Sequence, residues 1–219
     1  MEIASVIFDF DGTLFDSMPV WDGAGEAYLR SIGREPKPGL KETVQTMSLY
    51  QAACYLQKEY GLELTAEEII NGVSRVVADA YRYQILPKPG VPEFLAALKE
   101  AGITMGIATA SERPLIEAAL VRCGLLAFFE RILTCSEAKS GKDSPEIFQK
   151  MAELLHADCS NTVVFEDAFH AARTAKSAGF AVTGVYDPSE PEQDGMKKLC
   201  DCYLPDFYHT ETFWKLERV

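Results

Sequence analysis

Residues 6–14 read Val-Ile-Phe-Asp-Phe-Asp-Gly-Thr-Leu, an apolar run that passes through two aspartates into a glycine turn. The run predicts a buried strand that ends at Phe8. Alternate residues of an extended chain point to the same side, with Cα atoms roughly 6.5 Å apart, so Asp9 and Asp11 should face one spot beyond the strand end. Two like charges held this close require a cation between them or a raised pKa in one of them. Either outcome suits chemistry on an anionic substrate.

Further apolar runs suited to buried parallel strands recur along the chain. Helix-like stretches with apolar residues three and four apart separate them. This alternation predicts an α/β fold, a Rossmann-like parallel sheet covered on both faces. The expected strands are 6–8, 103–108, 132–134, 162–165, 181–185 and 202–204. The expected helices after residue 90 are 92–101, 113–123, 145–156, 168–178 and 191–199.

The segment between the first strand and Pro87 shows no strand pattern. It predicts three helices: one that begins at Asp16 or Ser17, one over residues 43–60, and one that Thr65 caps and that reaches about residue 83. We therefore expect a helical cap domain of residues 16–86, inserted into a catalytic core of residues 1–15 and 87–219. The two ends of the insertion must meet beside the first strand. That would put the cap over the carboxyl edge of the sheet, where ligands of open α/β sheets bind.

The charge of the chain limits its partners. A formal net charge of -12 argues against a sequence-independent hold on nucleic acid and against binding to an anionic membrane surface. The first residues show neither a basic region nor a signal cleavage site, and no stretch approaches the length of a bilayer span. The six cysteines are scattered, without metal-ligand spacing. We expect a cytoplasmic protein with reduced thiols, either a monomer or a weak dimer.

Polar residues follow three further strands of the predicted sheet. Thr109, Ala110 and Ser111 come after the second strand, Lys142 after the third, and Glu166 with Asp167 after the fourth. A parallel sheet brings these strand ends to the same rim as the first aspartates. Two aspartates, a hydroxyl, a lysine and an acidic pair match the needs of phosphoryl transfer to a carboxylate, in which one carboxylate attacks phosphorus and another protonates the leaving oxygen.

These four motifs, in this order, make the chain resemble the haloacid dehalogenase-like (HAD) phosphohydrolase superfamily. The resemblance is to the branch with a helical cap after the first motif, which includes β-phosphoglucomutase and many small phosphatases. It covers essentially the whole chain. Residues 9–17 are similar to the first motif, Thr109 to the second, Lys142 to the third, and Glu166 with Asp167 to the fourth.

The resemblance implies a role for each acidic residue. Asp9 would be the nucleophile that forms an aspartyl-phosphate, and Asp11 the general acid and then the base. Mg²⁺ would be held by the Asp9 carboxylate, the Asp11 backbone carbonyl and Asp167. Glu166 would either bind the ion directly or contact the groups that bind it. Taken alone, Glu166 and Asp167 could instead complement the dipole of the helix that they open.

The resemblance also implies residues that bind the substrate, a small phosphorylated metabolite. Thr109 would hydrogen-bond a phosphoryl oxygen, helped by the N–H groups of Ala110 and Ser111, while Lys142 would offset charge around the nucleophile. Thr109 and Ser111 could instead cap the helix that starts near residue 112, and we expect Ser111 to do so. Trp21 would offer a flat wall for a sugar or a base in the cap, although an aromatic there could simply be core.

Departures from the family pattern shape the functional prediction. After the fourth motif many relatives read Ser-x-x-Gly, whereas residues 168–171 read Ala-Phe-His-Ala, and the role of His170 stays open. The cap histidine of β-phosphoglucomutase falls at Trp21, and its phosphate-binding arginine falls near Leu49. We predict a Mg²⁺-dependent phosphohydrolase of a small phosphate monoester, whose substrate is selected by Met18, Trp21 and residues 47–50. A phosphomutase acting on a sugar phosphate and a non-catalytic phosphate-binding sensor are the alternatives.

Overall fold

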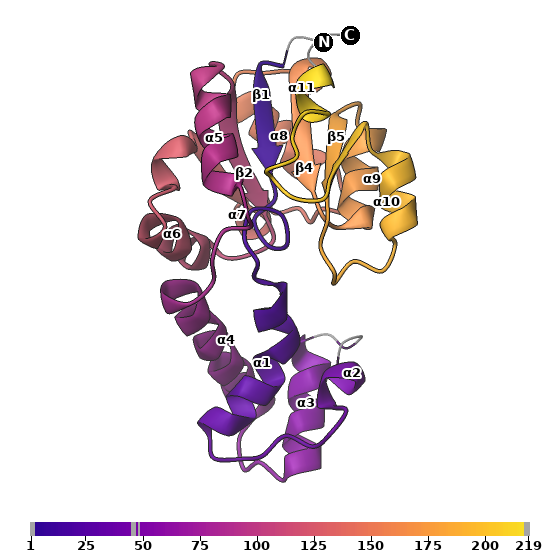
Figure 1. The fold of residues 1–219 in the computed structure, drawn as a ribbon. Coiled ribbons are helices and arrows are strands. Elements are labelled where there is room, and N and C mark those ends of the chain that lie inside the picture. The colour runs from indigo at the N-terminus through magenta and orange to yellow at the C-terminus, as the bar shows by residue number, and fades with distance from the viewer. Residues whose placement is uncertain (1–2, 45–46, 48, 217–219) are drawn as a thin grey trace. The chain divides into compact units, whose positions relative to one another are not determined.

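The computed structural model describes residues 3–44, 47 and 49–216. The chain divides into two compact units: a core unit of Met1–Asp16 and Ile85–Val219, and a helical unit of Ser17–Gln84 (Figure 1). These boundaries lie within two residues of the expected ones. All six strands belong to the core unit, and the helical unit contains only helices and loops in the part of it that the structure describes.

The core unit is built on one sheet in which all neighbouring strands are parallel, in the order β3-β2-β1-β4-β5-β6. The strands are β1 (Ser5–Phe8), β2 (Thr104–Thr109), β3 (Arg131–Thr134), β4 (Thr162–Glu166), β5 (Ala181–Val185) and β6 (Cys202–Leu204). Their ends differ from the expected ones by one residue at most, and the predicted α/β class is confirmed. In the register of the sheet, Phe8 lies beside Ile107 of β2 and Phe165 of β4. The residues that follow these three strands therefore meet at one edge.

Helices cover both faces of this sheet. On one face, Phe8 and Phe165 pack against Phe94, with ring centroids 6.4 and 5.6 Å from it. On the other face, Ile7 and Val164 belong to a buried apolar cluster with α8 and α9. Alternate strand residues thus supply two cores, which explains the nearly continuous apolar runs. The helices of this unit are α5 (Val91–Glu100), α6 (Arg113–Arg122), η1 (Leu126–Phe128), α7 (Cys135–Ala138), α8 (Glu146–Leu154), η2 (Cys159–Asn161), α9 (Phe169–Ser177), α10 (Gln193–Leu199) and α11 (Phe213–Leu216).

The helical unit corrects one prediction. It contains α1 (Met18–Ser31), α2 (Leu40–Val44), α3 (Leu49–Tyr60) and α4 (Ala66–Tyr83), so the single helix expected over residues 43–60 is wrong. The first of the two helices begins earlier than expected, directly after Gly39, whose φ of 80° ends the preceding turn. Residue 47 lies in a bend, so the helical hydrogen bonding does not run through to α3. The cap predicted at Thr65 is confirmed, since its hydroxyl accepts a hydrogen bond from the N–H of Glu68 at 3.2 Å.

The two connections between the units meet at the turn that follows β1. The N–H of Asp16 donates to the carbonyl oxygen of Leu86 at 3.0 Å, and Phe15 forms an antiparallel bridge with Pro87. The helical unit is therefore a true insertion, because the chain leaves and re-enters the core unit at neighbouring points.

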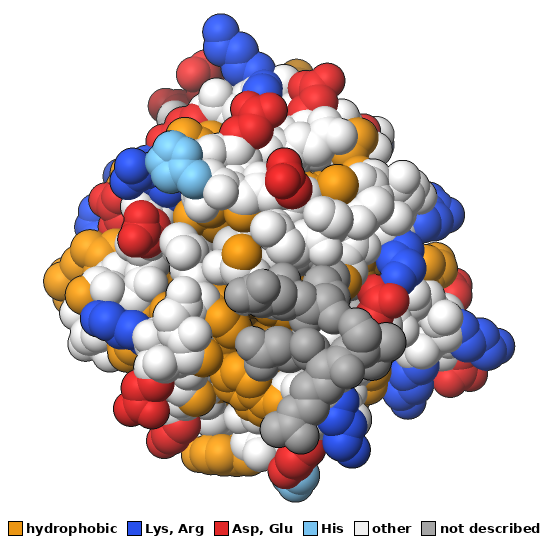
Figure 2. Space-filling model, turned by 90° about the horizontal axis from the view of Figure 1, so that it is seen from above, with side chains coloured by type: hydrophobic (Ala, Val, Ile, Leu, Met, Phe, Trp, Pro, Cys, Tyr) orange, Lys and Arg blue, Asp and Glu red, His pale blue; other side chains and the backbone are white. Residues whose placement is uncertain are grey.

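The surface mixes both signs of charge. On the face drawn in Figure 2, Lys and Arg side chains are spread around the edge among Asp and Glu side chains, and the described side chains form no continuous basic surface there. None of the helices in the described ranges is both long and apolar enough to cross a membrane.

Candidate active site

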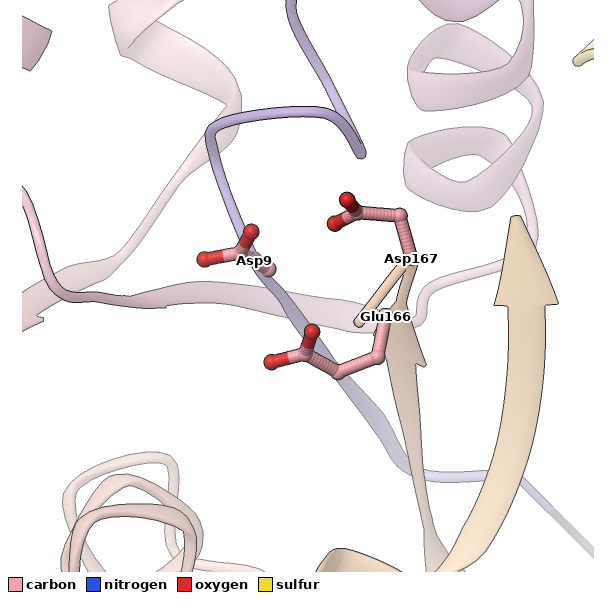
Figure 3. A group of neighbouring side chains, drawn as sticks. All are labelled: Asp9, Glu166 and Asp167. Carbon is pink, nitrogen blue, oxygen red and sulfur yellow. The ribbon is translucent and has the colours of Figure 1, made fainter. Parts of the chain in front are cut away.

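Three acidic side chains meet at the carboxyl edge of the central strands. The N–H of Asp9 donates to the carbonyl oxygen of Phe165 at 2.9 Å, which continues the strand pairing past β1. Asp9 is thereby held beside Glu166 and Asp167, which end and follow β4. One carboxylate oxygen from each of the three lies within 4.8 Å of the other two, and all three residues are buried. Figure 3 shows the carboxylates of Glu166 and Asp167 extending from the end of β4 toward Asp9.

Lys142 places a positive charge among these carboxylates. The residue lies in the loop between α7 and α8, and it is only 9% exposed. Its Nζ donates to Asp9 Oδ1 and, at 2.6 Å, to Glu166 Oε1. Burial disfavours the ammonium form, but the Asp9 and Glu166 carboxylates outweigh it and raise the pKa of Lys142 above its ordinary value. The lysine thus stays charged and bridges two strand ends.

One lysine does not balance three buried carboxylates. Burial raises the pKa of Asp9, and that of Asp167 well above its ordinary value, although Lys142 acts in the opposite direction on both. Burial likewise raises the pKa of Glu166 to about 7. Glu166 Oε2 is buried and has no hydrogen-bond partner among the described residues. Because a buried, unpaired carboxylate oxygen is costly, this oxygen-only set of donors fits a hard divalent cation such as Mg²⁺.

Thr13 holds the Asp167 carboxylate of the acidic group. Its buried hydroxyl donates to Asp167 Oδ1 at 2.8 Å. Gly12, with a φ of 77°, makes the turn that brings Thr13 back toward the end of β4. The sequence pattern predicted no separate role for Thr13. The available signal was its position two residues after Asp11, within the first motif.

The Asp11 carboxylate lies outside the acidic group. Asp11 is half-buried, and its Oδ2 accepts a hydrogen bond from the Ser111 hydroxyl at 2.5 Å. Ser111 therefore does not use its hydroxyl to cap α6, whose N-cap position is occupied by Glu112. The Asp9 and Asp11 side chains, expected to face one spot, engage different partners at the same strand end. The Asp11 backbone carbonyl as a metal ligand stays a prediction.

The second motif lies at the end of β2. Thr109 is buried, and its Oγ1 accepts a hydrogen bond from the N–H of Ser111 at 3.0 Å. Ala110, between them, is exposed. The three residues follow a strand next to β1, so they share its carboxyl edge with Asp9. Contact with a phosphoryl oxygen stays a prediction for each of them.

The substrate residues expected in the cap belong to the helical unit. Trp21 lies on α1, where its Nε1 donates to the hydroxyl of Tyr81 at 2.8 Å and its side chain remains 37% exposed. Met18 lies at the start of the same helix. Of the expected residues 47–50, residue 48 lies outside the described part of the chain. In the core unit, His170 is exposed in the first turn of α9, with no role assigned.

Comparison with known proteins identifies the family. Residues 3–179 match the model of the haloacid dehalogenase-like hydrolases. A protein of Dickeya dadantii named probable phosphatase IndB is 33% identical over 195 residues, which cover 82% of this chain and 80% of that protein. The phosphorylated carbohydrates phosphatase of Thermotoga maritima is 27% identical over 195 residues, covering 89% of both chains.

A solved structure supports the same assignment. It is that of a Thermotoga maritima protein provisionally named a β-phosphoglucomutase, which superimposes with a TM-score of 0.85 at 25% identity, over 100% of both chains. The predicted resemblance is confirmed, as is the prediction of an enzyme. The chain belongs to the haloacid dehalogenase-like hydrolase family, and it is similar there to proteins named phosphatases.

Proposed function

We propose that this protein is a Mg²⁺-dependent phosphohydrolase that cleaves a small phosphate monoester through an aspartyl-phosphate at Asp9. The observation that carries the proposal is the buried group of Asp9, Glu166 and Asp167 around Lys142, with Glu166 Oε2 left without a partner among the described residues. The Asp9 carboxylate lies beside the charged Lys142, and Glu166 Oε2 can accept a metal ion. This arrangement suits attack of a carboxylate on an anionic phosphate.

The metal ion would be held by Asp9, Asp167 and the Asp11 carbonyl, with Glu166 beside them. When bound, it would neutralise charge on the phosphoryl oxygens and on the nucleophile. Lys142 would stabilise the Asp9 carboxylate from the other side, through the contact that it already makes. The removal of one such preorganised charge typically slows a reaction by about 100- to 1,000-fold.

In the first half-reaction, Asp9 Oδ would form a bond to phosphorus while the bond from phosphorus to the ester oxygen breaks. Asp11 would give its proton to that leaving oxygen. In the second, a water molecule would attack phosphorus and pass its proton to Asp11, and the Asp9–phosphorus bond would break to release inorganic phosphate. Asp11 is half-buried and held by the Ser111 hydroxyl, so it combines access to solvent with a defined orientation.

Thr109 would orient the phosphoryl group. A hydroxyl that accepts a hydrogen bond from the N–H of Ser111 keeps its own proton to donate to a phosphoryl oxygen. The exposed Ala110 would add a backbone N–H, and Ser111 would act mainly through Asp11.

The substrate class proposed is a small phosphorylated metabolite, with sugar phosphates as the first candidates. The phosphorylated carbohydrates phosphatase among the relatives supports this choice. We also propose that residues 16–86 act as a cap that selects the substrate, with Met18, Trp21 and residues 47–50 as the selecting residues. The insertion of the helical unit directly after the first motif supports that role.

A phosphomutase is the second candidate, because a similar structure is provisionally named a β-phosphoglucomutase. A mutase needs a group in the cap that passes protons between substrate hydroxyls. Trp21 stands at the position of the expected histidine, and an indole N–H is a donor only. Its Nε1 already donates to Tyr81. Because the Trp21 N–H cannot pass protons between substrate hydroxyls, this hydrogen bond supports a phosphohydrolase over a phosphomutase.

The test is phosphate release from a panel of sugar phosphates, nucleotides and other monoesters, with Mg²⁺ and with EDTA, for the wild type and Asp9→Asn. We expect Mg²⁺-dependent release that Asp9→Asn abolishes. Hydrolysis retained in Asp9→Asn would sink the covalent mechanism. Isomerised sugar phosphate formed with a bisphosphate activator would favour the mutase. A wild type that binds phosphate and hydrolyses nothing would favour the sensor.

A further inference from the structure

The helix that follows the acidic pair begins without a capping side chain of its own. The N-cap position of α9 is occupied by Ala168, whose φ of -84° and ψ of 120° are typical of a capping residue but whose methyl group cannot accept a hydrogen bond. The first N–H groups of any helix have no partner within the helix. Here the first α-helical bond is donated by Ala172 to the carbonyl oxygen of Ala168, at 3.0 Å.

A side chain from another part of the chain supplies an acceptor for the first N–H group of α9. Glu190, in the loop between β5 and α10, accepts a hydrogen bond from the N–H of Phe169 on its Oε2 at 2.9 Å. Its other oxygen, Oε1, accepts from the N–H of Glu192 at 2.7 Å. Both oxygens of the carboxylate are thus held by backbone donors. A carboxylate at the N-terminus of a helix is also favoured by the helix dipole.

The loop that carries Glu190 is itself well held. The Gln193 side chain donates to the carbonyl oxygens of Asp187 at 2.7 Å and of Glu190 at 3.0 Å, and it accepts from the Tyr203 hydroxyl at 2.6 Å. Asp187 is buried and forms an ion pair with Lys88 at 2.8 Å. Glu190 is therefore presented from a loop that side-chain hydrogen bonds and a buried ion pair hold in place.

We propose that Glu190 is a positioning residue for the metal site, which fixes the turn of residues 167–169 and thereby the carboxylate of Asp167. This inference rests on the proposed function, because it takes Asp167 as a metal ligand. Asp167 lies two residues before Phe169 and receives a hydrogen bond from Thr13 on Oδ1. Thr13 orients the side chain, and Glu190 holds the backbone from which that side chain extends.

The test measures Mg²⁺ binding to the substrate-free protein, by the Mg²⁺-dependent rise in Tm and by calorimetric titration. Loss of a group that orients a metal ligand typically weakens metal affinity by about 10- to 100-fold, and we expect that range for Glu190→Ala. Glu190→Gln keeps one acceptor oxygen for the N–H of Phe169, at the expense of the contact with the N–H of Glu192, and should stay closer to the wild type than Glu190→Ala. Glu192→Ala is the matched control: it removes the same charge from the same loop, and only the backbone N–H of Glu192 takes part in the contact.

A rescue separates positioning from general stabilisation. In the Glu190→Ala background, Ala168→Ser places a hydroxyl at the N-cap position, where it can accept from the N–H of residue 170 or 171 and hold the same turn by a different bond. The double variant should therefore recover most of the Mg²⁺ affinity. If Glu190→Ala lowers Tm without Mg²⁺ but binds Mg²⁺ like the wild type, its role is only structural and the proposal is overturned. Weakening in Glu190→Gln equal to that in Glu190→Ala would also overturn it, because an acceptor for the N–H of Phe169 would then not maintain the metal site.

Mg²⁺ binding by the substrate-free protein and hydrolysis of an ester are separate measurements. A wild type that binds Mg²⁺ but hydrolyses no ester defeats the proposed function, and the comparison of variants still decides the role of Glu190. A wild type that does not bind Mg²⁺ overturns the metal site and the positioning role together.

Discussion

The Thr13 hydroxyl donates to Asp167 Oδ1 at 2.8 Å, and this bond ties the turn after β1 to the end of β4. Both residues are buried, so water cannot replace the bond when it is lost. The contact joins the first and fourth motifs directly. The turn after β1 thereby helps to fix the orientation of the Asp167 carboxylate at the end of β4.

Thr13→Val keeps the shape of the side chain but removes the donor. We expect the free energy of unfolding to fall by about 1–3 kcal/mol, the usual cost of leaving a buried acceptor without its partner. Urea denaturation measures it. Thr174→Val is the control, because Thr174 is a half-buried residue of α9 whose hydroxyl donates to the carbonyl oxygen of His170, four residues earlier in the chain. Equal effects of the two substitutions would contradict the prediction.

Lys142→Met removes the positive charge that contacts Asp9 and Glu166. We expect kcat to fall by about 100- to 1,000-fold, because the charge around the nucleophile is no longer balanced. Steady-state kinetics of phosphate release measures the change, after a thermal melt has confirmed that the variant folds. Lys139→Met is the matched control, since Lys139 is an exposed lysine of the same segment. An unchanged kcat in Lys142→Met would exclude an electrostatic role for this lysine.

The pH dependence of stability should change sign when Mg²⁺ is added. Burial raises the pKa of Glu166 from 4.5 to about 7, and those of Asp9 and Asp167 in the same direction. The folded, metal-free protein therefore binds more protons than the unfolded chain in this window. The contribution of these groups to stability is fully present in acid and is lost as the pH rises toward 7.

Mg²⁺ prefers the ionised carboxylates, so it should stabilise the protein more at about pH 8 than at about pH 5. Thermal melts with EDTA and with Mg²⁺ measure the stabilisation by Mg²⁺ at each pH. Subtracting the Tm in EDTA from the Tm in Mg²⁺ at the same pH removes the contribution of the other titrating groups. A larger Mg²⁺ effect in acid would contradict the arrangement of three buried, proton-binding carboxylates.

The ion pair of Lys88 with Asp187 should be essential to the stability of the core unit. Lys88 also donates to the carbonyl oxygen of Tyr186 at 2.6 Å, and both charged side chains are buried. Lys88→Met leaves the Asp187 carboxylate without its cation, and we expect a loss of about 3–5 kcal/mol in the free energy of unfolding.

The double variant Lys88→Met/Asp187→Leu removes both charges and should lose much less, as chemical denaturation would show. Lys99→Met, at the exposed end of α5, serves as the control for the substitution itself. A double variant no more stable than Lys88→Met would show that the paired charges are not what makes the single change costly.

The strands could be predicted to within one residue because each is a local pattern: a short apolar run bounded by turn residues. The capping box at Thr65 and Glu68 is local in the same way, since its partners are three positions apart in the chain. The helix expected over residues 43–60 is wrong because apolar residues three and four apart occur in both α2 and α3, and this spacing does not show where one helix ends and the next begins. In the structure α2 ends at Val44, residue 47 lies in a bend and α3 begins at Leu49.

For the candidate site, the expectation of a parallel sheet was enough to bring Asp9, Lys142, Glu166 and Asp167 to one edge. The contacts among them were beyond prediction. Ser111 bonds Asp11 rather than capping α6, which no local pattern could show, because the choice depends on a residue 100 positions away.

The sequence by itself determined the order of strands and helices, the position of the insertion and the residue types at the sheet edge, because neighbouring residues specify each of these. The tertiary structure alone decided which donor meets which acceptor. Thr13 reaches Asp167, and Glu190 reaches Phe169, across strands that are adjacent in the sheet but distant in the chain. Hydrogen bonds and buried charges act over a few ångströms, so their partners are chosen only when the sheet has formed.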